Sequence, residues 1–371
     1  MQDNNAVTLS VNGLDYGGWK KVSISAGIER QCRDFTLDIS WSPDGPSTMV
    51  PVPIKQGDRA QVRIGQDLVL TGYVFATPIR YDANQITRGM GGRSKPADLV
   101  DSAAINQPGQ WSGQSMQAIV QALAGEYGIQ VISQVTETSQ ISEHTIEPGE
   151  TVFESIDRLL TLSRLLSTDD EYGRLVIIEP GSGGRTFDRL ELGENVLEGS
   201  MGADFSGVFS EYRVVGQRKR KDDEDGAEAS EVQARVTDPR SPRKRVLLIQ
   251  ESGQMTTELA EARANWERGN RIGKALMVQY TVQGWRQSNG ALWKVNTIVR
   301  VVDALLGLDR DMLISEIEYS LDEGGTLSHI TVGPIEAFLP EPKDPHKARK
   351  LKKGGKADNF EYLIPADWKP E

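Results

Sequence analysis

Apolar and polar residues alternate along the stretch from Met277 to Phe338, which carries the clearest pattern in the chain. Odd positions from 317 to 321 are apolar, whereas even positions from 316 to 320 carry Glu or Ser. This period of two places one row of side chains on each face of a strand. Turn signals at 288–290 and 323–325 separate the segments. We therefore predict antiparallel strands over 277–285, 292–302, 312–321 and 326–332, in a small barrel or sandwich.

The N-terminal part of the chain shows the same alternation of apolar and polar residues. We predict strands over 7–11, 22–25, 35–41, 60–64 and 68–75, with a proline-rich loop after the third of them. No clear residue-level repeat links this region to 277–338, so the similarity is one of pattern. The sequence thus predicts two all-β regions that share the same pattern of alternating apolar and polar residues.

A mixed region lies between the two β regions. An apolar stripe with helical spacing predicts a helix over 115–125. Thr151 and Glu154 have the spacing of a capping box, which predicts the start of a second helix. A short apolar run over 175–178 predicts a strand. This combination is typical of an α+β segment.

The predicted fold class is α+β and mainly β, with two small antiparallel β-barrel domains flanking an α+β middle segment. The predicted domains are a first β-barrel over 1–96, the middle segment over 97–195, a second β-barrel over 196–338 with one helix over 257–274, and an extended tail over 339–371. The tail lacks apolar periodicity, yet it contains three aromatic residues, and we expect these to contact a partner: Phe360, Tyr362 and Trp368.

The composition indicates a globular chain without a membrane span. Hydrophobic residues make up 38% of the 371 positions and charged residues 26%. There is no run of about 18 apolar residues and no visible secretory signal, so we expect no stable membrane insertion. The net charge of −11 argues against nucleic-acid specificity, because phosphate binding needs clustered Lys and Arg. Basic runs at 218–221, 243–245 and 347–356 are interpreted as solvated loops.

No metal, cofactor or catalytic site is predicted from the reactive residues. His144, His329 and His346 are scattered and show no metal-ligand spacing. We interpret His329 as a structural residue of a strand. Cys32 is the only cysteine, which excludes an internal disulfide. Its arginine neighbours could lower its thiol pKa, but a structural cysteine is the preferred interpretation.

Two weaker patterns also fall short of a catalytic site. The glycine-rich Gly181–Gly184 lacks the Lys-Ser/Thr pair of a Walker A motif. Carboxylate pairs such as Glu316 and Glu318 are expected on any solvated strand. A glycosidase would need two carboxylates brought together by the fold. We therefore expect that the protein is not an enzyme.

One segment of the middle region suggests glycan binding. Residues from His144 to Ile156 read as a short strand, a Pro-Gly-Glu-Thr turn and the start of a helix. This segment resembles the opening of a LysM module, and the LysM-like portion covers about 144–180. The Asn-rich loop usual in that family is replaced by Ser167–Gly173. The resemblance therefore implies the fold of such a unit more strongly than its glycan binding.

A wider set of motifs covers nearly the whole chain. These motifs are Gly17-Gly-Trp19, Thr71-Gly-Tyr73, Gly92–Asp101, Gln110-Trp111, Pro148–Val152, Gly193–Asn195, Phe209–Tyr212, Gly284-Trp285 and Gly290–Trp293. In order and spacing they resemble the baseplate hub proteins of Mu-like contractile phage tails, the late-control-protein-D group. One departure is Gln85–Met90, where that pattern leads us to expect a cleaner apolar strand.

The resemblance implies a structural, non-enzymatic hub in the virion tail baseplate, made in the bacterial cytoplasm. It implies a homotrimer in which two β-barrel domains per chain give six similar modules. Six modules match the six-fold tail tube, and three chains match a trimeric spike, so the implied partners are further copies, the spike, the tube and other baseplate proteins. Type VI secretion spike proteins have a similar architecture. Three tryptophans could lie in the trimer interfaces or in the core, and we favour the core: Trp19, Trp285 and Trp293.

An alternative function remains open at this point. A cell-wall-binding tail component would hold peptidoglycan through the LysM-like middle segment. A glycan hydrolase is a third, weaker hypothesis, since it would need turnover of peptidoglycan that depends on an acidic residue. Binding to purified cell-wall sacculi separates the first alternative from a hub.

Overall fold

The computed structural model describes residues 4–41, 54–83, 86–135, 140–217 and 231–342. The chain divides into two compact units, Met1–Phe209 with Trp266–Glu341, and Ser210–Asn265 with Pro342–Glu371. The first unit contains both of the predicted β regions and the mixed middle region.

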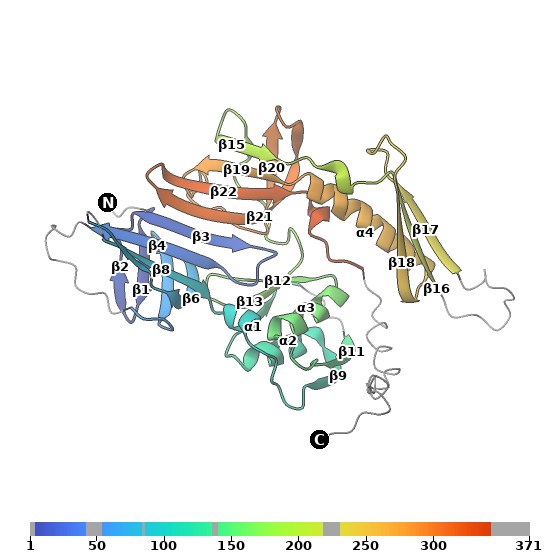
Figure 1. Ribbon diagram of the computed structural model, residues 1–371, viewed down its shortest axis with the longest axis horizontal. Helices are drawn as coiled ribbons and strands as arrows, with labels where there is room; N and C mark the ends of the chain where they lie inside the picture. Colours follow the sequence, from blue (N-terminus) through green and yellow to red (C-terminus); the bar gives the residue numbers. More distant parts are fainter. Residues whose placement is uncertain (1–3, 42–53, 84–85, 136–139, 218–230, 343–371) are drawn as a thin grey trace, which may run out of the picture. The chain divides into compact units, whose positions relative to one another are not determined.

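One large sheet dominates the first unit and has fourteen strands in the described part of the chain (Figure 1). Its main path runs in the spatial order β15 (Val196–Met201), β19 (Val278–Gln283), β22 (Gly325–Gly333), β21 (Leu308–Asp322), β3 (Lys21–Gly27), β4 (Asp34–Trp41), β8 (Ile86–Ser94), β6 (Asp67–Ala76), β5 (Arg59–Ile64), β1 (Val7–Val11) and β2 (Leu14–Tyr16). Off this path, β20 (Ile298–Asp303) pairs with β21, β14 (Leu190–Glu191) pairs with β20, and β7 (Ile79–Tyr81) pairs with β8. Nearly all of these pairings are antiparallel.

The long strand β21 connects the two β regions. Residues 308–313 pair with β20, whereas residues 316–321 pair on the same edge with β3. The opposite edge pairs with β22 along most of the strand. Because β21 is fifteen residues long, one of its edges can pair first with β20 and then, further along the strand, with β3. A single strand therefore joins the N-terminal and C-terminal halves of the sheet.

The core of the large sheet is shared by both halves. A single cluster of buried side chains runs from Val7 in β1 to Val332 in β22. Trp19, Trp285 and Trp293 all belong to it, and each is at least nine-tenths buried. This confirms the preferred prediction that the three tryptophans are core residues within one chain.

The two halves of the large sheet have the same strand order. The first half reads β3-β4-β8-β6-β5-β1, and the second half reads β15-β19-β22-β21-β20-β14. Strands at matching places also follow one another in the same order along the chain. We call the first set repeat 1 (β1 to β8) and the second set repeat 2 (β14, β15 and β19 to β22). One outer pairing differs, because β1 is antiparallel to β5 whereas β14 is parallel to β20.

The middle region packs three short helices around small sheets. Its elements are α1 (Ala97–Asp101), β9 (Gln110–Ser115), α2 (Met116–Gly125), β10 (Val131–Ser133), β11 (Gln140–Thr145), α3 (Val152–Leu162), β12 (Leu166–Asp169) and β13 (Leu175–Ile178). Strand β9 pairs with β11, and β13 lies between β10 and β12. The predicted capping box is formed, since Thr151 and Glu154 each accept a backbone N–H from the other. The helices bury their apolar stripes in a core of their own.

The second unit contains a separate three-stranded sheet. Its order is β17 (Glu231–Thr237), β16 (Glu211–Gln217) and β18 (Val246–Gln254), with β16 antiparallel to β17 and parallel to β18. The predicted helix over 257–274 is present as α4 (Thr257–Ala275), which belongs to the second unit up to Asn265 and to the first unit from Trp266 on. The 3₁₀ turns η1 (Phe205–Gly207) and η3 (Ile335–Ala337) belong to the first unit.

Among the helices of the described residues, none combines the length and apolarity needed to cross a bilayer.

The mainly β, α+β class is confirmed, and two details differ from the sequence prediction. In the described part of the chain, the strand pairings join the two β regions in one sheet and close neither of them into a barrel. The strand predicted over 292–302 begins only at Ile298. The reason is Asn296, which has a φ of 61° and whose side-chain amide contacts the backbone of Glu179 and Gly181. The predicted domain boundaries stay a prediction.

Candidate functional site

The registers of the two repeats match across most of their strand pairs. Register shifts at Val62/Arg63 in repeat 1 and at Val196/Glu198 in repeat 2 have no counterpart in the other repeat. In repeat 1, the pairing of β6 with β8 is irregular between Val74 and Ala76. In repeat 2, the pairing of β21 with β22 is irregular between Ile314 and Glu316. A β-bulge therefore lies at the same place in both repeats, and counting from it aligns all neighbouring strands.

This alignment identifies counterparts for the strands at the ends of each repeat. Strand β7 pairs with residues 86–88 of β8, just as residues 319–321 of β21 pair with residues 326–328 of β22. Strand β7 is thus the counterpart of the last part of β21. In the same way β15 is the counterpart of β3, with Ser200 at the place of Ser23 and Gly199 at the place of Val22.

The joint between the repeats is the pairing of β21 with β3. Residues 316–321 lie opposite residues 22–27 in antiparallel register. On the apolar side Tyr319 packs against Trp285, with ring centroids 6.3 Å apart and a T-shaped arrangement. The Tyr319 hydroxyl donates to the carbonyl of Trp293. Burial raises the pKa of this hydroxyl, so it stays a proton donor at any physiological pH.

Polar side chains secure the other face of the joint. The hydroxyl of Ser23 donates to Oε1 of Glu318 at 2.6 Å. Arg30 lies 2.8 Å from Oε1 of Glu316 in an ion pair between half-exposed side chains. These contacts connect residues almost three hundred positions apart in the chain. They fix which residues of the two repeats lie opposite each other.

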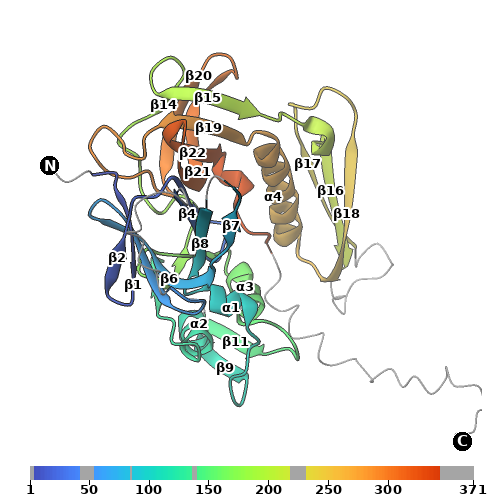
Figure 2. The same ribbon diagram turned by 60° about the vertical axis from the view of Figure 1, so that its left-hand side comes forward.

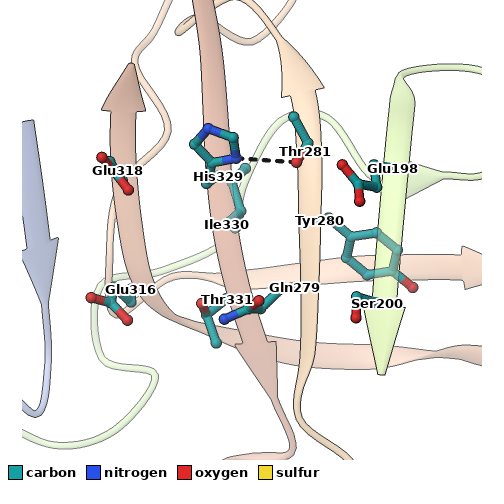
Figure 3. A pocket seen from close by; sticks show the side chains of 10 residues that line it. All are labelled: Glu198, Ser200, Gln279, Tyr280, Thr281, Glu316, Glu318, His329, Ile330 and Thr331. Carbon is teal, nitrogen blue, oxygen red and sulfur yellow. Dashed lines mark hydrogen bonds between the residues drawn. The ribbon is translucent and has the colours of Figure 1, made fainter. Parts of the chain in front are cut away.

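A shallow hollow of about 480 Å³ lies on this polar face (Figure 3). It crosses β15, β19, β22 and β21, and its lining is mostly polar: Glu198, Ser200, Gln279, Tyr280, Thr281, Glu316, Glu318, His329, Ile330 and Thr331. His329 lies in β22, between β19 and β21. Its Nδ1 is 3.1 Å from the hydroxyl of Thr281, and its Nε2 is 3.1 Å from that of Ser320.

The chemistry of the hollow is that of a hydrated surface rather than a reaction centre. Both ring nitrogens of His329 contact hydroxyl groups on neighbouring strands, which supports the structural interpretation of this residue. Glu316 and Glu318 are held by Arg30 and Ser23. Among the residues that the structure describes, no group of three or more His, Cys, Asp or Glu side chains could hold a metal ion.

The middle region is tied to repeat 1 by a buried ion pair. The Arg33 guanidinium lies 3.2 Å from Oδ1 of Asp169 in β12, and the Arg33 backbone N–H donates to Oδ2 of the same carboxylate at 3.0 Å. Burial raises the pKa of Asp169, and the charge of Arg33 opposes this rise.

Cys32 precedes Arg33 in the chain. Burial raises the pKa of the Cys32 thiol to about 11, and the positive charge of Arg93 opposes this rise. Cys32 is thus a neutral thiol at neutral pH, as expected of a structural cysteine.

The remaining residues singled out in the sequence do not gather at one place. His144 is buried, with Nε2 2.8 Å from the hydroxyl of Ser155. Phe360, Tyr362, Trp368 and His346 lie outside the described residues. The LysM-like segment has its strand β11 and helix α3, and glycan binding by it stays a prediction.

Sequence reasoning missed two elements that the repeat makes important. Strand β15 falls within residues that carry little alternation, since Gly199 and Gly202 interrupt the pattern. Strand β7 has only three residues. The available signal was the pair Ile79 and Tyr81 around Arg80, which has the period of a strand but is very short.

Family models for Mu phage baseplate proteins match three stretches of the chain. The N-terminal domain model "Mu phage baseplate assembly protein GpP-like" covers residues 6–94. The second domain model "Baseplate hub protein gp44-like" covers residues 96–179. The fourth domain model "Mu phage baseplate assembly protein GpP" covers residues 256–341.

Whole-chain relatives agree with these models. The baseplate hub protein gp44 of Escherichia phage Mu is 30% identical over 367 residues, covering 95% of this chain and 93% of that protein. The crystal structure of the 43 kDa tail protein of prophage MuSo2 from Shewanella oneidensis has a TM-score of 0.81 and 34% identity, covering 91% of this chain and all of that one. A tail protein from Neisseria meningitidis MC58 has a TM-score of 0.75 at 18% identity, covering 91% and 98%, and shows the shared fold. The chain therefore belongs to the baseplate hub protein family of Mu-like phages, whose members are structural, non-enzymatic components of the virion tail.

Proposed function

We propose that three copies of this chain form a ring that adapts the six-fold tail tube to the three-fold central spike. The observation that carries this proposal is the internal repeat. Repeat 1 and repeat 2 share strand order, register and a β-bulge, so one chain offers two nearly equivalent modules. Three chains then offer six modules in a ring whose true symmetry is three-fold.

The joint inside one chain supports this arrangement. Repeat 2 is bonded to repeat 1 by antiparallel strand pairing between β21 and β3, as Figure 1 shows. The same step, repeated from module to module, leads around a ring. We propose that each repeat, completed by its neighbours, acts as one of the two β-barrel domains expected from the family resemblance. In this role the protein needs shape and bonding edges but no reactive group.

The proposed partners follow from the two symmetries of the ring. A six-module face suits a tube of six-fold symmetry, and the three-fold axis suits a trimeric spike. Other baseplate proteins would bind the periphery. We further propose that Phe360, Tyr362 and Trp368 of the tail anchor on one of these neighbours, because aromatic residues are enriched among binding hot spots.

The solution mass of the full chain tests the proposed ring. Light scattering after size exclusion should give about 123 kDa, three times the 40.9 kDa chain, and particle images should show six lobes with three-fold symmetry. A different closed symmetry, such as a dimer with a two-fold axis, would refute the proposal. Removal of residues 343–371 should leave the mass ratio at three and weaken only binding to other baseplate proteins.

A further inference from the structure

We propose that neighbouring copies join through a specific strand pairing, β7 of one copy with β15 of the next, in a register that places Arg80 opposite Ser200. This inference rests on the proposed ring and names the edges that close it. Its template is the joint within one chain, where Ser320 lies opposite Ser23. Arg80 is the counterpart of Ser320, and Ser200 is the counterpart of Ser23.

Strand β7 is exposed where its counterpart is covered. Tyr319 is only 7% exposed, because β3 and the core cover it. Its counterpart Ile79 is 59% exposed, and Tyr81, the counterpart of the half-buried Leu321, is 82% exposed. In the described part of one chain, β7 pairs with β8 alone (Figure 2). Large apolar side chains on an open edge strand are rare in stable monomers, because such edges invite pairing.

Strand β15 shows the matching feature at the far end of the sheet. It is the first strand of the main path and pairs with β19. Its counterpart β3 is bonded on both edges, and Val22 there is buried. In β15 the residue at that place, Gly199, is exposed, and Leu197 is 59% exposed. Among the described residues, each repeat thus leaves one edge without a strand partner, apart from an isolated bridge between Val196 and Leu192 at the start of β15. These two edges are the counterparts of the two edges already joined inside the chain.

The charges on the two edges are complementary in the proposed register. Arg80 of one copy would lie opposite Ser200 of the next and diagonal to Glu198, two positions along the same face. Diagonal neighbours on paired strands lie within reach of a long side chain such as Arg. At the joint within the chain, the place of Glu198 is taken by Lys21, so the two joints differ in charge. This difference favours pairing of β7 with β15 over pairing of β7 with a second β3.

Pairing of this kind produces a closed assembly. The β7 and β15 edges are different surfaces, so each copy donates one and accepts the other, as in head-to-tail rings. Because the geometry of the internal joint is repeated, the sheet continues from copy to copy without a break. The ring then contains three joints within chains and three between chains. The occupant of each open edge is a second copy of this chain.

Disulfide trapping tests the proposed register. In a Cys32→Ser background, the full chain carries Arg80→Cys and Ser200→Cys and is oxidised at the concentration where it assembles. Cysteines opposite each other on paired strands have Cβ atoms within disulfide reach. We expect covalent trimers on a non-reducing gel. Mixing heavy-isotope and light chains should show that the disulfide between positions 80 and 200 joins peptides of different copies.

Two matched variants calibrate this test. Ser23→Cys with Ser320→Cys marks the same register at the joint within the chain, so it should oxidise within single copies. Arg80→Cys with Gln279→Cys moves the second thiol one strand further, to β19, where Gln279 lies opposite Ser200. Adjacent strands are about 4.8 Å apart, so this pair is separated by about twice that distance and should not cross-link.

Each outcome separates this inference from the proposed ring. A trimer that forms without the disulfide between positions 80 and 200, while the internal pair oxidises, overturns the register and leaves the ring intact. A chain that forms no trimer and no cross-link overturns both. Cross-linking of Arg80→Cys with Gln279→Cys instead would show a different register and also contradict the inference. A cross-linked trimer of the first pair supports both proposals.

Discussion

Repeat 1 and repeat 2 have the same backbone plan but fill it with different side chains. At one cross-strand place, repeat 1 pairs Phe35 with Gly92, whereas repeat 2 pairs Val278 with Val332. At another, Leu37 faces Val22 in repeat 1, and Tyr280 faces Gly199 in repeat 2. In both examples one repeat places an aromatic ring opposite a glycine where the other repeat pairs two aliphatic side chains. At these two places the repeats share the strand pairing and not the residue identity.

The repeats also differ in what covers their last strand. In repeat 2 the end of β21 is covered by β3 of the same chain, whereas in repeat 1 the counterpart β7 pairs, within the part of the chain that the structure describes, with β8 alone. A residue at the same place therefore contributes to folding in one repeat and to assembly in the other. This distinction leads to predictions that separate the free energy of unfolding from the affinity between copies.

The largest expected effect is the loss of a buried side chain at the internal joint. Tyr319→Ala should lower the free energy of unfolding by about 3–5 kcal/mol, because a large core side chain and its hydrogen bond to Trp293 are removed. Ile79→Ala, at the matching place in repeat 1, should change it by less than about 0.5 kcal/mol in the dissociated chain. Urea denaturation at a protein concentration too low for assembly measures the unfolding free energy of both variants. Similar losses of unfolding free energy for the two variants would contradict the distinction between a folding role for Tyr319 and an assembly role for Ile79.

The next largest effect concerns the open edge. Tyr81→Asp places a charge on the proposed edge and should weaken association of the copies by about 30-fold or more, which corresponds to about 2 kcal/mol per joint. The unfolding free energy of the single chain should stay the same. Leu305→Asp is the matched control, since Leu305 is equally exposed, at 84%, but lies in the turn between β20 and β21. Sedimentation at a series of protein concentrations gives the affinity between copies for each variant. Equal weakening by the two substitutions would contradict the proposal that β7 forms the interface.

A smaller effect tests the balance of volumes. In Gly199→Val the new side chain meets the Tyr280 ring, because even a Cβ at Gly199 would lie 2.9 Å from that ring. Overpacking of this kind costs about 1–3 kcal/mol. Adding Tyr280→Leu recreates the Val–Leu pair of repeat 1 and should recover about 1 kcal/mol as coupling in a double-mutant cycle. Gly202→Val, where a Cβ meets nothing within 4 Å, should show no such coupling.

The smallest effect concerns an ion pair found in repeat 2. The Arg185 guanidinium donates to both carboxylate oxygens of Asp311 and lowers the pKa of that carboxyl below its ordinary value. A carboxyl with a lowered pKa in the folded state stabilises the fold above its ordinary pKa, and this contribution disappears as the pH falls through the folded-state pKa. Asp311→Asn should therefore cost less than about 1 kcal/mol at pH 7, because the pair is half-exposed.

The pH profile provides the control for that prediction. The difference between the original chain and Asp311→Asn should shrink as the pH falls below the ordinary pKa of an aspartate, and it should vanish below the lower pKa of Asp311 in the folded state. The counterpart of Asp311 in repeat 1 is Thr71, which has no charge, so Thr71→Ser should leave the pH dependence unchanged. Chemical denaturation at neutral and acidic pH measures both variants. A constant difference across this range would show that the ion pair does not stabilise the fold.

The strands of strict alternation could be predicted from the sequence because burial on one face imposes a period of two. This applies to β4, β19 and the end of β21, whose positions were predicted closely. Helix α3 could be predicted equally well, since its capping box is a signal within a few consecutive residues. The shared sheet could not be predicted, because the pairing of β21 with β3 depends on residues far apart in sequence. The internal repeat could not be predicted because matching places carry different residues, as Leu37 and Tyr280 do.

The candidate site shows the same limit. The core roles of the three tryptophans and the structural role of His329 could be inferred from composition and position. The open edges could not be predicted, since the alternation around Ile79 covers only three residues and Gly199 interrupts the alternation of β15. Their importance follows only from the register that relates them to Tyr319 and Val22.

The long strand β21 also has a consequence for the order in which the chain is completed during synthesis. Strand β3 is made within the first thirty residues, but the strand that covers its edge is made almost three hundred residues later. Until then, β3 of a nascent chain presents an open edge very like that of β15 in the finished protein. An open edge of this kind can pair with a strand of another chain before the chain's own β21 is made. Lys21 stands at the place that Glu198 takes in β15, so Arg80 of β7 would meet a like charge there, and pairing of β7 with this nascent edge is disfavoured.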